Sequence, residues 1–285
     1  MVGKKKNTGM VRLMSIFGSN GKLMAGCTML LLLILAAIFA PFITTRSPYV
    51  LGSDLLLPPG EKYPLGTDGL GRDVYSMLIY GIRTSLLVGV VAALISAVLG
   101  VLFGAFSGYY GGRFDQVFTE INNIFLMLPA FFLVLIIVAL FGSSLLNVMI
   151  VIGLTSWPSN ARLMRAQAMS LRERTFVRSA LAIGESRSRI VFRYIIPNGI
   201  FPVVANTTMG IGGAILTEAG LSFLGLGDPN VVSWGQMINQ GRAYLSTGWW
   251  VSTFAGAATL IVVLIFYLIG DGINEILNPK PQKES

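Results

Sequence analysis

Apolar stretches without a charged residue recur along the chain and set its expected architecture. The segments 23–43, 84–107 and 249–270 contain no Asp, Glu, Lys or Arg, and neither does the longer run 121–157. A helix needs about 20 apolar residues to cross the hydrocarbon core of a membrane, so each of the first three segments predicts one spanning helix. The Gly-Ser-Ser sequence at 142–144 divides the longer run into two further helices joined by a tight turn.

A sixth apolar segment, 195–223, is also expected to span the membrane, although two prolines and Glu218 make it the weakest of the six. The first helix of the divided run is expected to begin near Phe118 and to carry Glu120 in its first turn. The sequence therefore predicts an all-α, polytopic membrane protein with about six transmembrane helices.

Positively charged residues orient these helices. With the N-terminus inside the cell, the Lys and Arg residues left outside are Arg46, Lys62, Arg72, Arg83 and Arg242. All the other Lys and Arg residues then face the cytoplasm, as the enrichment of these residues in cytoplasmic loops requires. The sequence thus predicts a multi-pass protein of the cell (inner) membrane with both termini in the cytoplasm.

This orientation divides the chain into three parts. A cytoplasmic N-terminal segment, 1–22, precedes a transmembrane domain, 23–273, and a cytoplasmic tail, 274–285, follows it. Within the domain, an external segment occupies 45–83 and a cytoplasmic loop occupies 162–194.

Composition agrees with a membrane protein and argues against several function classes. Hydrophobic residues make up 54% and charged residues 12% of the chain, and its mean hydropathy is +0.72, whereas soluble domains carry about 25% charged residues. The chain has no histidine, which removes His-based acid–base catalysis and His metal ligands. Its lone cysteine, Cys27, cannot form an intrachain disulfide. Membrane topology accounts for the net charge of +8, so no nucleic-acid partner is expected. Because the chain lacks histidine, no metal site or catalytic residue is expected either.

The external segment 45–83 begins irregularly, because prolines and glycines are frequent in its first half. Asp68 is placed to cap a short helix that begins near Gly71. The apolar residues of 74–82 fall near helical spacing, which predicts a short amphipathic helix lying on the membrane surface.

From Pro64 the chain reads PLGTDGLGRDVYSMLIYGIRTSL. This string resembles a signature of the second permease subunit of dipeptide, oligopeptide and nickel ABC importers, and the later strings SFLGLG, WGQMI and GDGINEILNPK resemble the same family. The resemblance implies the type I importer permease fold. It also implies structural or gating roles for Gly66, Thr67, Asp68, Gly71, Arg72, Asp73, Arg83 and Asp271. Of these, Asp271 is expected to lie at the inner interface or to cap a helix.

The cytoplasmic loop 162–194 has a single glycine, Gly184, which predicts two short helices separated there. The string RSALAIGESRSRIVFRYIIPN resembles the coupling motif of ABC importer permeases, but Arg178 stands at the motif's Glu, Ser179 at its first Ala and Tyr194 at its Ile. By resemblance, the loop inserts into a groove of a cytoplasmic ATPase subunit; the alternative is a solvated basic loop near anionic lipid. The expected coupling residues are Arg178, Ser179, Ala180, Gly184, Glu185, Ser186 and Arg187.

Two features of the spanning segments suggest roles. Glu218 is an ionisable residue in the outer half of the fifth span, and such residues mark functional sites by default. It is expected to line the pathway or bind a substrate amine, the alternative being a gate or helix-end contact near the outer surface. Glycines at 100, 104, 108 and 112 recur at a spacing that lets helices approach closely. This spacing favours packing within the bundle over contact with a second permease.

The family resemblance implies a permease subunit of an ATP-driven ABC importer that translocates di- or oligopeptides, with nickel chelates or oligosaccharides as alternative solutes. Its implied partners are a second homologous permease, two ATP-binding subunits, an extracytoplasmic substrate-binding protein and membrane lipid. No GxxxxGKS or GxxxxGKT phosphate loop occurs in the chain. ATP and Mg²⁺ are therefore expected to bind the partner subunits, and this chain is expected to hold no cofactor and to be no enzyme. An ATP-independent channel or carrier, which would need no ATPase dock, is the distant alternative.

Overall fold

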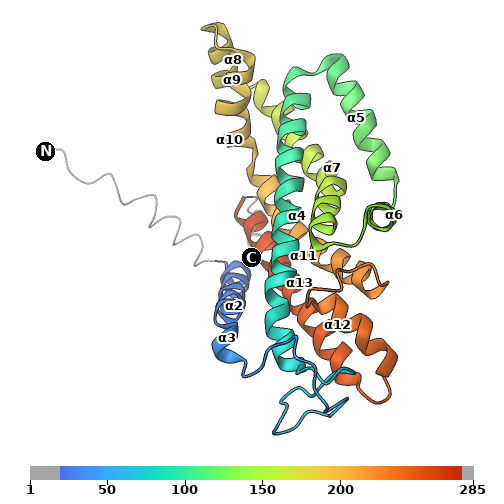
Figure 1. Ribbon diagram of the computed structural model, residues 1–285. Helices are drawn as coiled ribbons and strands as arrows, with labels where there is room; N and C mark the ends of the chain where they lie inside the picture. The colour runs from blue at the N-terminus through green and yellow to red at the C-terminus, as the bar shows by residue number, and fades with distance from the viewer. Residues whose placement is uncertain (1–19, 278–285) are drawn as a thin grey trace, which may run out of the picture.

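The computed structural model describes residues 20–277, and they form an elongated helical bundle with no β-strand in that range (Figure 1). The basic N-terminal residues and the last eight residues, on which part of the expected orientation depends, lie outside the described part. The helices, in chain order, are α2 (Gly21–Ile38), α3 (Ala40–Ile43), α4 (Val74–Tyr110), α5 (Gly112–Met127), α6 (Ala130–Phe141), α7 (Leu145–Arg172), α8 (Thr175–Ala182), α9 (Arg187–Ile190), α10 (Ile196–Gly199), α11 (Phe201–Phe223), α12 (Trp234–Gly241) and α13 (Trp249–Leu277). A π-helical turn, Val191–Ile195, links α9 to α10, and a 3₁₀ turn, Arg242–Tyr244, follows α12.

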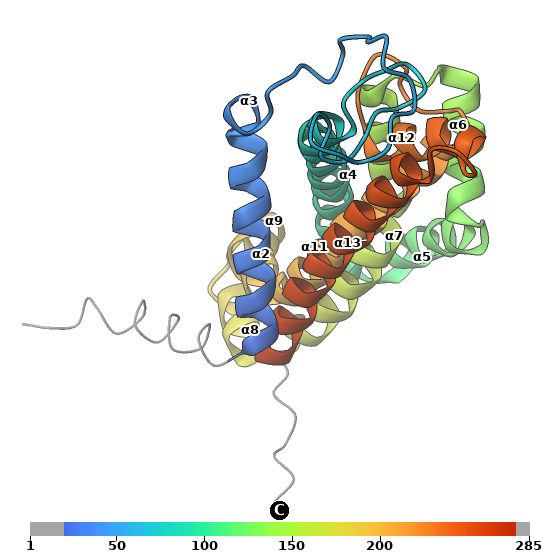
Figure 2. The ribbon, with the colours of Figure 1, turned by 90° about the horizontal axis from the view of Figure 1, so that it is seen from below.

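The two ends of the bundle differ. α8 and α9 project at one end, here called the α8 end, while α12 and the irregular segment between α3 and α4 cover the other, the α12 end (Figure 1). Seen along the perpendicular direction, α2 lies on one flank and α5 and α6 on the opposite flank, with α4, α7, α11 and α13 between them (Figure 2). The fold therefore places a central group of long helices between two flanking elements.

Small residues let α4 and α7 approach closely at the centre. A Cβ atom added at Gly104 would lie 2.4 Å from the carbonyl oxygen of Ala161, and one added at Gly108 would lie 2.4 Å from that of Arg165. At Gly100 the added atom would lie 2.4 Å from the Cβ of Asn160. The glycine spacing thus serves contact within the bundle, as the sequence favoured, because these positions are filled by this chain's own α7.

Length and composition bear on the number of spans. Among residues 20–277, α2, α4 and α13 are long and apolar enough to cross a membrane. Two bent helix pairs pass the same test together. They are α5 with α6, which meet at 86°, and the helical segment Arg187–Gly199, which runs from α9 to α10, with α11, which meet at 63°. All six predicted segments are helical, but α7, with 28 residues, does not pass on composition. The sixth span therefore stays a prediction.

Four helix boundaries differ from the expectations. The predicted surface helix at 74–82 is wrong, because α4 continues without a break from Val74 to Tyr110 and is capped by Asp73 rather than Asp68. α5 begins at Gly112 and bends away at Pro129, so Glu120 is in mid-helix rather than in a first turn. α7 continues eleven residues into the predicted loop 162–194, as far as Arg172.

The last helix is longer than expected. α13 extends to Leu277, beyond the predicted boundary at 273. Asp271 therefore lies within the helix and not at its cap. Its carboxylate accepts a hydrogen bond from Lys22 Nζ at 2.7 Å, and the same ammonium lies 2.5 Å from Glu275 Oε1. Asp271 thus helps to join the start of α2 to the end of α13.

Candidate functional site

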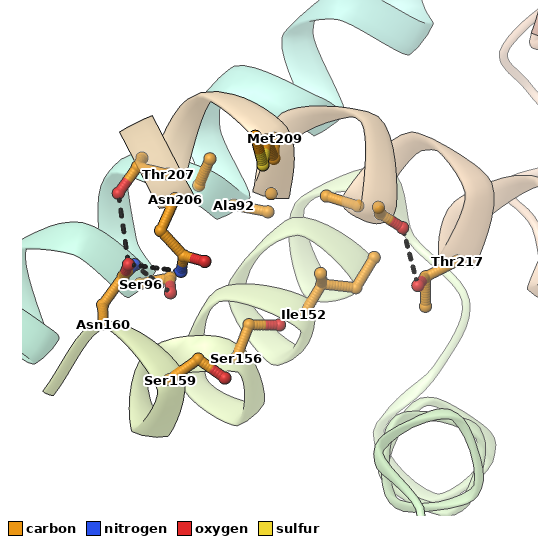
Figure 3. A pocket seen from close by; sticks show the side chains of 14 residues that line it. Ala92, Ser96, Ile152, Ser156, Ser159, Asn160, Asn206, Thr207, Met209 and Thr217 are labelled. Carbon is orange, nitrogen blue, oxygen red and sulfur yellow. Dashed lines mark hydrogen bonds between the residues drawn. The ribbon is translucent and has the colours of Figure 1, made fainter. Parts of the chain in front are cut away.

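A polar cavity lies between α4, α7 and α11, inside an otherwise apolar bundle (Figure 3). Its volume is about 390 Å³. α4 contributes small residues and a serine, α7 contributes two serines and an asparagine, and α11 contributes an asparagine, two threonines and small residues. The lining residues are Ala92, Ala93, Ser96, Ile152, Ser156, Ser159, Asn160, Asn206, Thr207, Met209, Gly210, Gly213, Ala214 and Thr217.

Asn160 on α7 joins the three walls of the cavity. Its amide nitrogen donates to Ser96 Oγ on α4 at 3.1 Å, and its amide oxygen accepts from Asn206 Nδ2 on α11 at 2.9 Å. Thr207 Oγ1 approaches the same oxygen at 3.4 Å. Asn160 is only 3% exposed, so these bonds satisfy a polar side chain that would otherwise be costly to bury. Figure 3 shows them converging on one edge of the cavity.

Uncharged side chains make up the whole lining of this cavity. The hydroxyls of Ser156 and Ser159 and the amide of Asn206 can exchange hydrogen bonds with a neutral polar solute, while Met209 and Ile152 supply apolar contact. Such a surface suits amide and hydroxyl groups, since a charged solute group would lose water without gaining a counter-ion here.

Sequence reasoning missed this cavity. It ended the fourth span at Trp157, about one turn before Asn160. The available signal was the group of polar residues Ser156, Ser159 and Asn160 at the end of that span and just beyond it. Polar residues within a membrane span usually face the bundle interior or a water-filled space.

The structure places Glu218 on a different side of α11. Its neighbour Thr217 lines the cavity, but the Glu218 carboxylate is directed toward α12 and is 3% exposed. Its Oε1 accepts hydrogen bonds from Ser222 Oγ at 2.7 Å and from Ser233 Oγ at 2.9 Å. Ser233 is also the N-cap of α12, accepting from the Gln236 amide at 3.2 Å. Glu218 thus holds α12 against α11, and a pathway role stays a prediction.

Glu218→Gln separates these two roles. A glutamine can keep the carbonyl oxygen that accepts from both serines, so we expect the variant to assemble and to transport with an unchanged KM. Glu218→Ala should lower stability by about 1–3 kcal/mol, because it leaves buried hydroxyls unpaired. Thermal unfolding and concentration-dependent uptake measure the two effects. A several-fold rise in KM for Glu218→Gln alone would support direct contact with solute.

The signature residues of the segment 45–83 hold that segment to the bundle. Asp68 accepts hydrogen bonds from the Leu70 and Arg72 backbone amides at 2.9 and 2.8 Å, and from Arg72 Nε at 2.7 Å. Arg72 in turn donates to Gln240 of α12 at 2.5 Å. Gly71 has a φ of +71°, and a Cβ there would lie 2.3 Å from the carbonyl oxygen of Gly52, so only glycine fits.

Three further contacts complete this attachment. Arg83 Nε donates to the carbonyl oxygen of Ala37 at 2.6 Å and so ties α4 to the end of α2. Trp250 Nε1 donates to the carbonyl oxygen of Thr67 at 3.0 Å, beside Gly66, whose φ is +80°. Asp73 caps α4 through the Ser76 amide at 3.1 Å. These contacts are structural and support the structural role that the resemblance implies; a gating role stays a prediction.

The predicted coupling residues lie on the α8–α9 projection. α8 ends at Ala182, and Gly184, two residues later, has a φ of +84°. The Glu185 and Gly184 amides donate to the carbonyl oxygens of Ala180 and Leu181, both at 3.1 Å. This pair of bonds is a Schellman motif, which requires a left-handed residue at Gly184. The expected break between two short helices is therefore confirmed.

α8 has one face on the bundle and one face outside it. Val177 and Ala180 are buried in a cluster that also contains residues of α4, α7 and α11. On the outer side, Phe176, Leu181 and Ile183 are 43%, 51% and 78% exposed. Polar solvent alone does not favour such an apolar group at the tip of a projection, so this face fits a protein partner.

Two charged residues of the α8–α9 projection pair with neighbours close in the sequence. Arg178, which stands where the motif has Glu, forms an ion pair with Glu173, and this hydrogen bond holds the pKa of the Glu173 carboxyl below its usual range. Glu185 accepts from the Tyr194 hydroxyl at 3.3 Å. Of the seven predicted coupling residues, Ala180 is buried and Glu185 is half-buried, while the others are exposed: Arg178, Ser179, Gly184, Ser186 and Arg187.

Comparisons with known proteins agree with this architecture. The chain is 38% identical over 249 residues to the dipeptide transport system permease protein DppC of Alkalihalophilus pseudofirmus, covering 87% of this chain and 82% of the relative. It is 39% identical over 260 residues to the glutathione transport system permease protein GsiD of Shigella flexneri, covering 90% and 86%. The Escherichia coli probable D,D-dipeptide transport system permease protein DdpC is 36% identical, covering 88% and 85%.

A solved structure shares the fold. An inward-facing form of the MetNI methionine ABC transporter contains a chain that superposes with a TM-score of 0.55 and 19% identity, covering 70% of this chain and 96% of that one. The family described as the binding-protein-dependent transport system inner membrane component matches residues 100–283, a range that includes the α7 and α11 walls of the polar cavity and the α8–α9 projection. This match and the identities to the permeases show that the chain belongs to that family of ABC transporter permeases.

Proposed function

We infer that the chain is the permease subunit of an ATP-driven importer of di- or oligopeptides. The observation that carries this inference is the projecting α8–α9 pair, whose exposed apolar side chains offer a docking face that an ATP-independent channel or carrier would not need. The relatives named for dipeptide and glutathione transport support a small peptide as the solute. The uncharged polar cavity suits the amide groups of such a solute.

Coupling would run through the buried face of α8. Val177 and Ala180 belong to the same cluster as Met164 and Ala168 of α7 and Val203 of α11. A partner that binds α8 differently in its ATP-bound and ATP-free states would move α7 and α11, two of the three walls of the cavity. Coupling of this kind requires such a differential contact between the two states.

The complete importer would then contain a second, homologous permease, two ATP-binding subunits that carry ATP and Mg²⁺, and an extracytoplasmic substrate-binding protein. Both termini and the α8 end would lie in the cytoplasm, and the α12 end would receive solute outside. Specificity would rest largely with the binding protein, because the cavity offers only uncharged groups.

Substitution at Gly184 tests the docking role. Added atoms there meet nothing within 4 Å, so a replacement acts only through the positive φ of +84°. Gly184→Val should distort the end of α8, because β-branched residues are strongly disfavoured at positive φ. We expect about a tenfold loss of peptide uptake together with reduced co-purification of the ATPase subunits, a loss equivalent to about 1.4 kcal/mol.

Gly184→Asn is the matched control, since asparagine tolerates the left-handed conformation. It should retain most of the uptake and of the bound ATPase. If Gly184→Val assembled and transported like the wild type, the docking role of this projection would be refuted.

A further inference from the structure

A second polar pocket lies between α5 and α7. Its volume is about 290 Å³, and its lining is Phe118, Thr119, Asn122, Asn123, Arg162 and Arg165. Along α7 the cavity residues run from Ile152 to Asn160, so this pocket lies closer to the α8 end. A solute that passes from the α12 end to the α8 end would reach it after the cavity.

Two buried polar atoms in this pocket lack a partner. Asn122 is 5% exposed, and its Oδ1 has no hydrogen bond among the described residues. The Thr119 hydroxyl is also buried and unpaired there. Because orphaned buried polar groups are costly, the pair is suited to a ligand that brings its own donors and acceptors.

One of the two arginines that line the pocket forms no ion pair within the described residues. Arg165 forms two hydrogen bonds of 2.6 Å with the carboxylate of Asp115, so its charge is compensated. Arg162 forms no ion pair within residues 20–277. Glu120 is an exposed carboxylate on α5 but is not part of the lining. The pocket therefore combines one guanidinium without an ion-pair partner with uncharged groups that can donate and accept hydrogen bonds.

The surroundings of the pocket favour a solute over a lipid. The exposed apolar residues of α5 occupy its opposite face, at the helical spacing Phe114, Val117, Ile121 and Ile124. The pocket instead adjoins polar residues of α5, including Asn123. On α7, Arg162 follows the cavity residue Ser159 by three positions and therefore lies beside it on the helix surface. The edges of the two sites therefore meet at Ser159 and Arg162.

We propose that this pocket binds the terminal carboxylate of the transported peptide on its way to the α8 end, with Arg162 as the binding cation. The inference rests on the proposed function and specifies which end of the solute is recognised. Arg162 pairs with the carboxylate, the last amide N–H of the peptide donates to Asn122 Oδ1, and the Thr119 hydroxyl takes part as donor or acceptor. The uncharged cavity, by contrast, contacts the neutral part of the solute.

Equilibrium binding to the complete importer, in nanodiscs of phosphatidylcholine and without its binding protein, tests the site. The probes are alanylalanine and its C-terminal amide, and the binding of each is measured by saturation-transfer NMR. We expect the wild type to bind the free acid more tightly than the amide. Arg162→Gln should weaken binding of the free acid at least tenfold and leave the amide unchanged, because a hydrogen bond to a charged group is lost. Arg162→Lys should retain part of the preference.

The control is Arg113→Gln, which removes an equal charge from the exposed start of α5, outside the pocket. It should bind both probes like the wild type. The proposal is overturned if the wild type does not distinguish the acid from the amide, if Arg162→Gln binds the acid normally, or if added phosphatidylglycerol abolishes the preference, which would assign the site to lipid. A complex that shows the preference but imports no di- or oligopeptide would refute the proposed function and leave the carboxylate site standing.

Discussion

Gly104→Ala is expected to destabilise the protein strongly, although alanine is ordinarily the better helix former by about 1 kcal/mol. The added methyl group would lie 2.4 Å from the carbonyl oxygen of Ala161, 2.9 Å from the Cβ of Met164 and 3.0 Å from the amide nitrogen of Arg165. Two of these three atoms belong to the α7 backbone, so the clash cannot be relieved by a rotamer change. α4 and α7 must move apart, at a cost of about 1–3 kcal/mol or more.

Gly256→Ala is the matched control, because it makes the same change in α13 where nothing lies within 4 Å of the added atom. The thermal midpoint of the purified protein should fall for Gly104→Ala and should hold or rise for Gly256→Ala. Equal midpoints for the two variants would show that α4 and α7 are not in the close contact described here.

Close packing of the glycine face of α4 within the bundle could be predicted from the sequence, whereas the helix that covers it, α7, and the polar cavity could not. Glycines four residues apart lie on one face of a helix, which therefore lacks side chains, and the structure places α7 against that face. In α7, however, the expected span ended at Trp157, so Ser159 and Asn160 fell outside it. Their common direction toward α11 depends on how three helices pack, which no local pattern specifies.

Glu218 and the start of α4 show the same limit. The sequence marks Glu218 as an ionisable residue within a span, and the structure buries its side chain. Its partner Ser233 lies 15 residues away across an irregular connection, so the direction of its side chain was not predictable. At the start of α4, residues 74–82 have the spacing of a surface helix, but Val74 and Met77 are covered by α12 and α13. Tertiary contact decides there between a separate helix and a longer one.

Asn160→Leu is expected to have the largest effect of any change inside the cavity. Leucine has a similar volume, but it removes the bonds that link α7 to Ser96 on α4 and to Asn206 on α11. Each lost bond costs about 1 kcal/mol, and leaving the buried Ser96 hydroxyl without its present partner adds to this. We expect a loss of roughly 2–4 kcal/mol in stability and the loss of most peptide uptake, since the three walls would no longer hold their relative positions.

The network can be separated from a simple packing defect with a second substitution. Ser96→Ala removes the hydroxyl that Asn160→Leu orphans, so the double variant should be less destabilised than the sum of the single variants. Ser159→Ala, at a lining hydroxyl that makes no such bridge, should change stability by no more than about 0.5 kcal/mol. Additive effects of the first two substitutions, measured by thermal unfolding and uptake, would show that the amide of Asn160 does not bind the helices together. Coupled effects would show that the Asn160 amide links α7 to α4 and α11, so that a movement of α7 is transmitted to both other walls of the cavity.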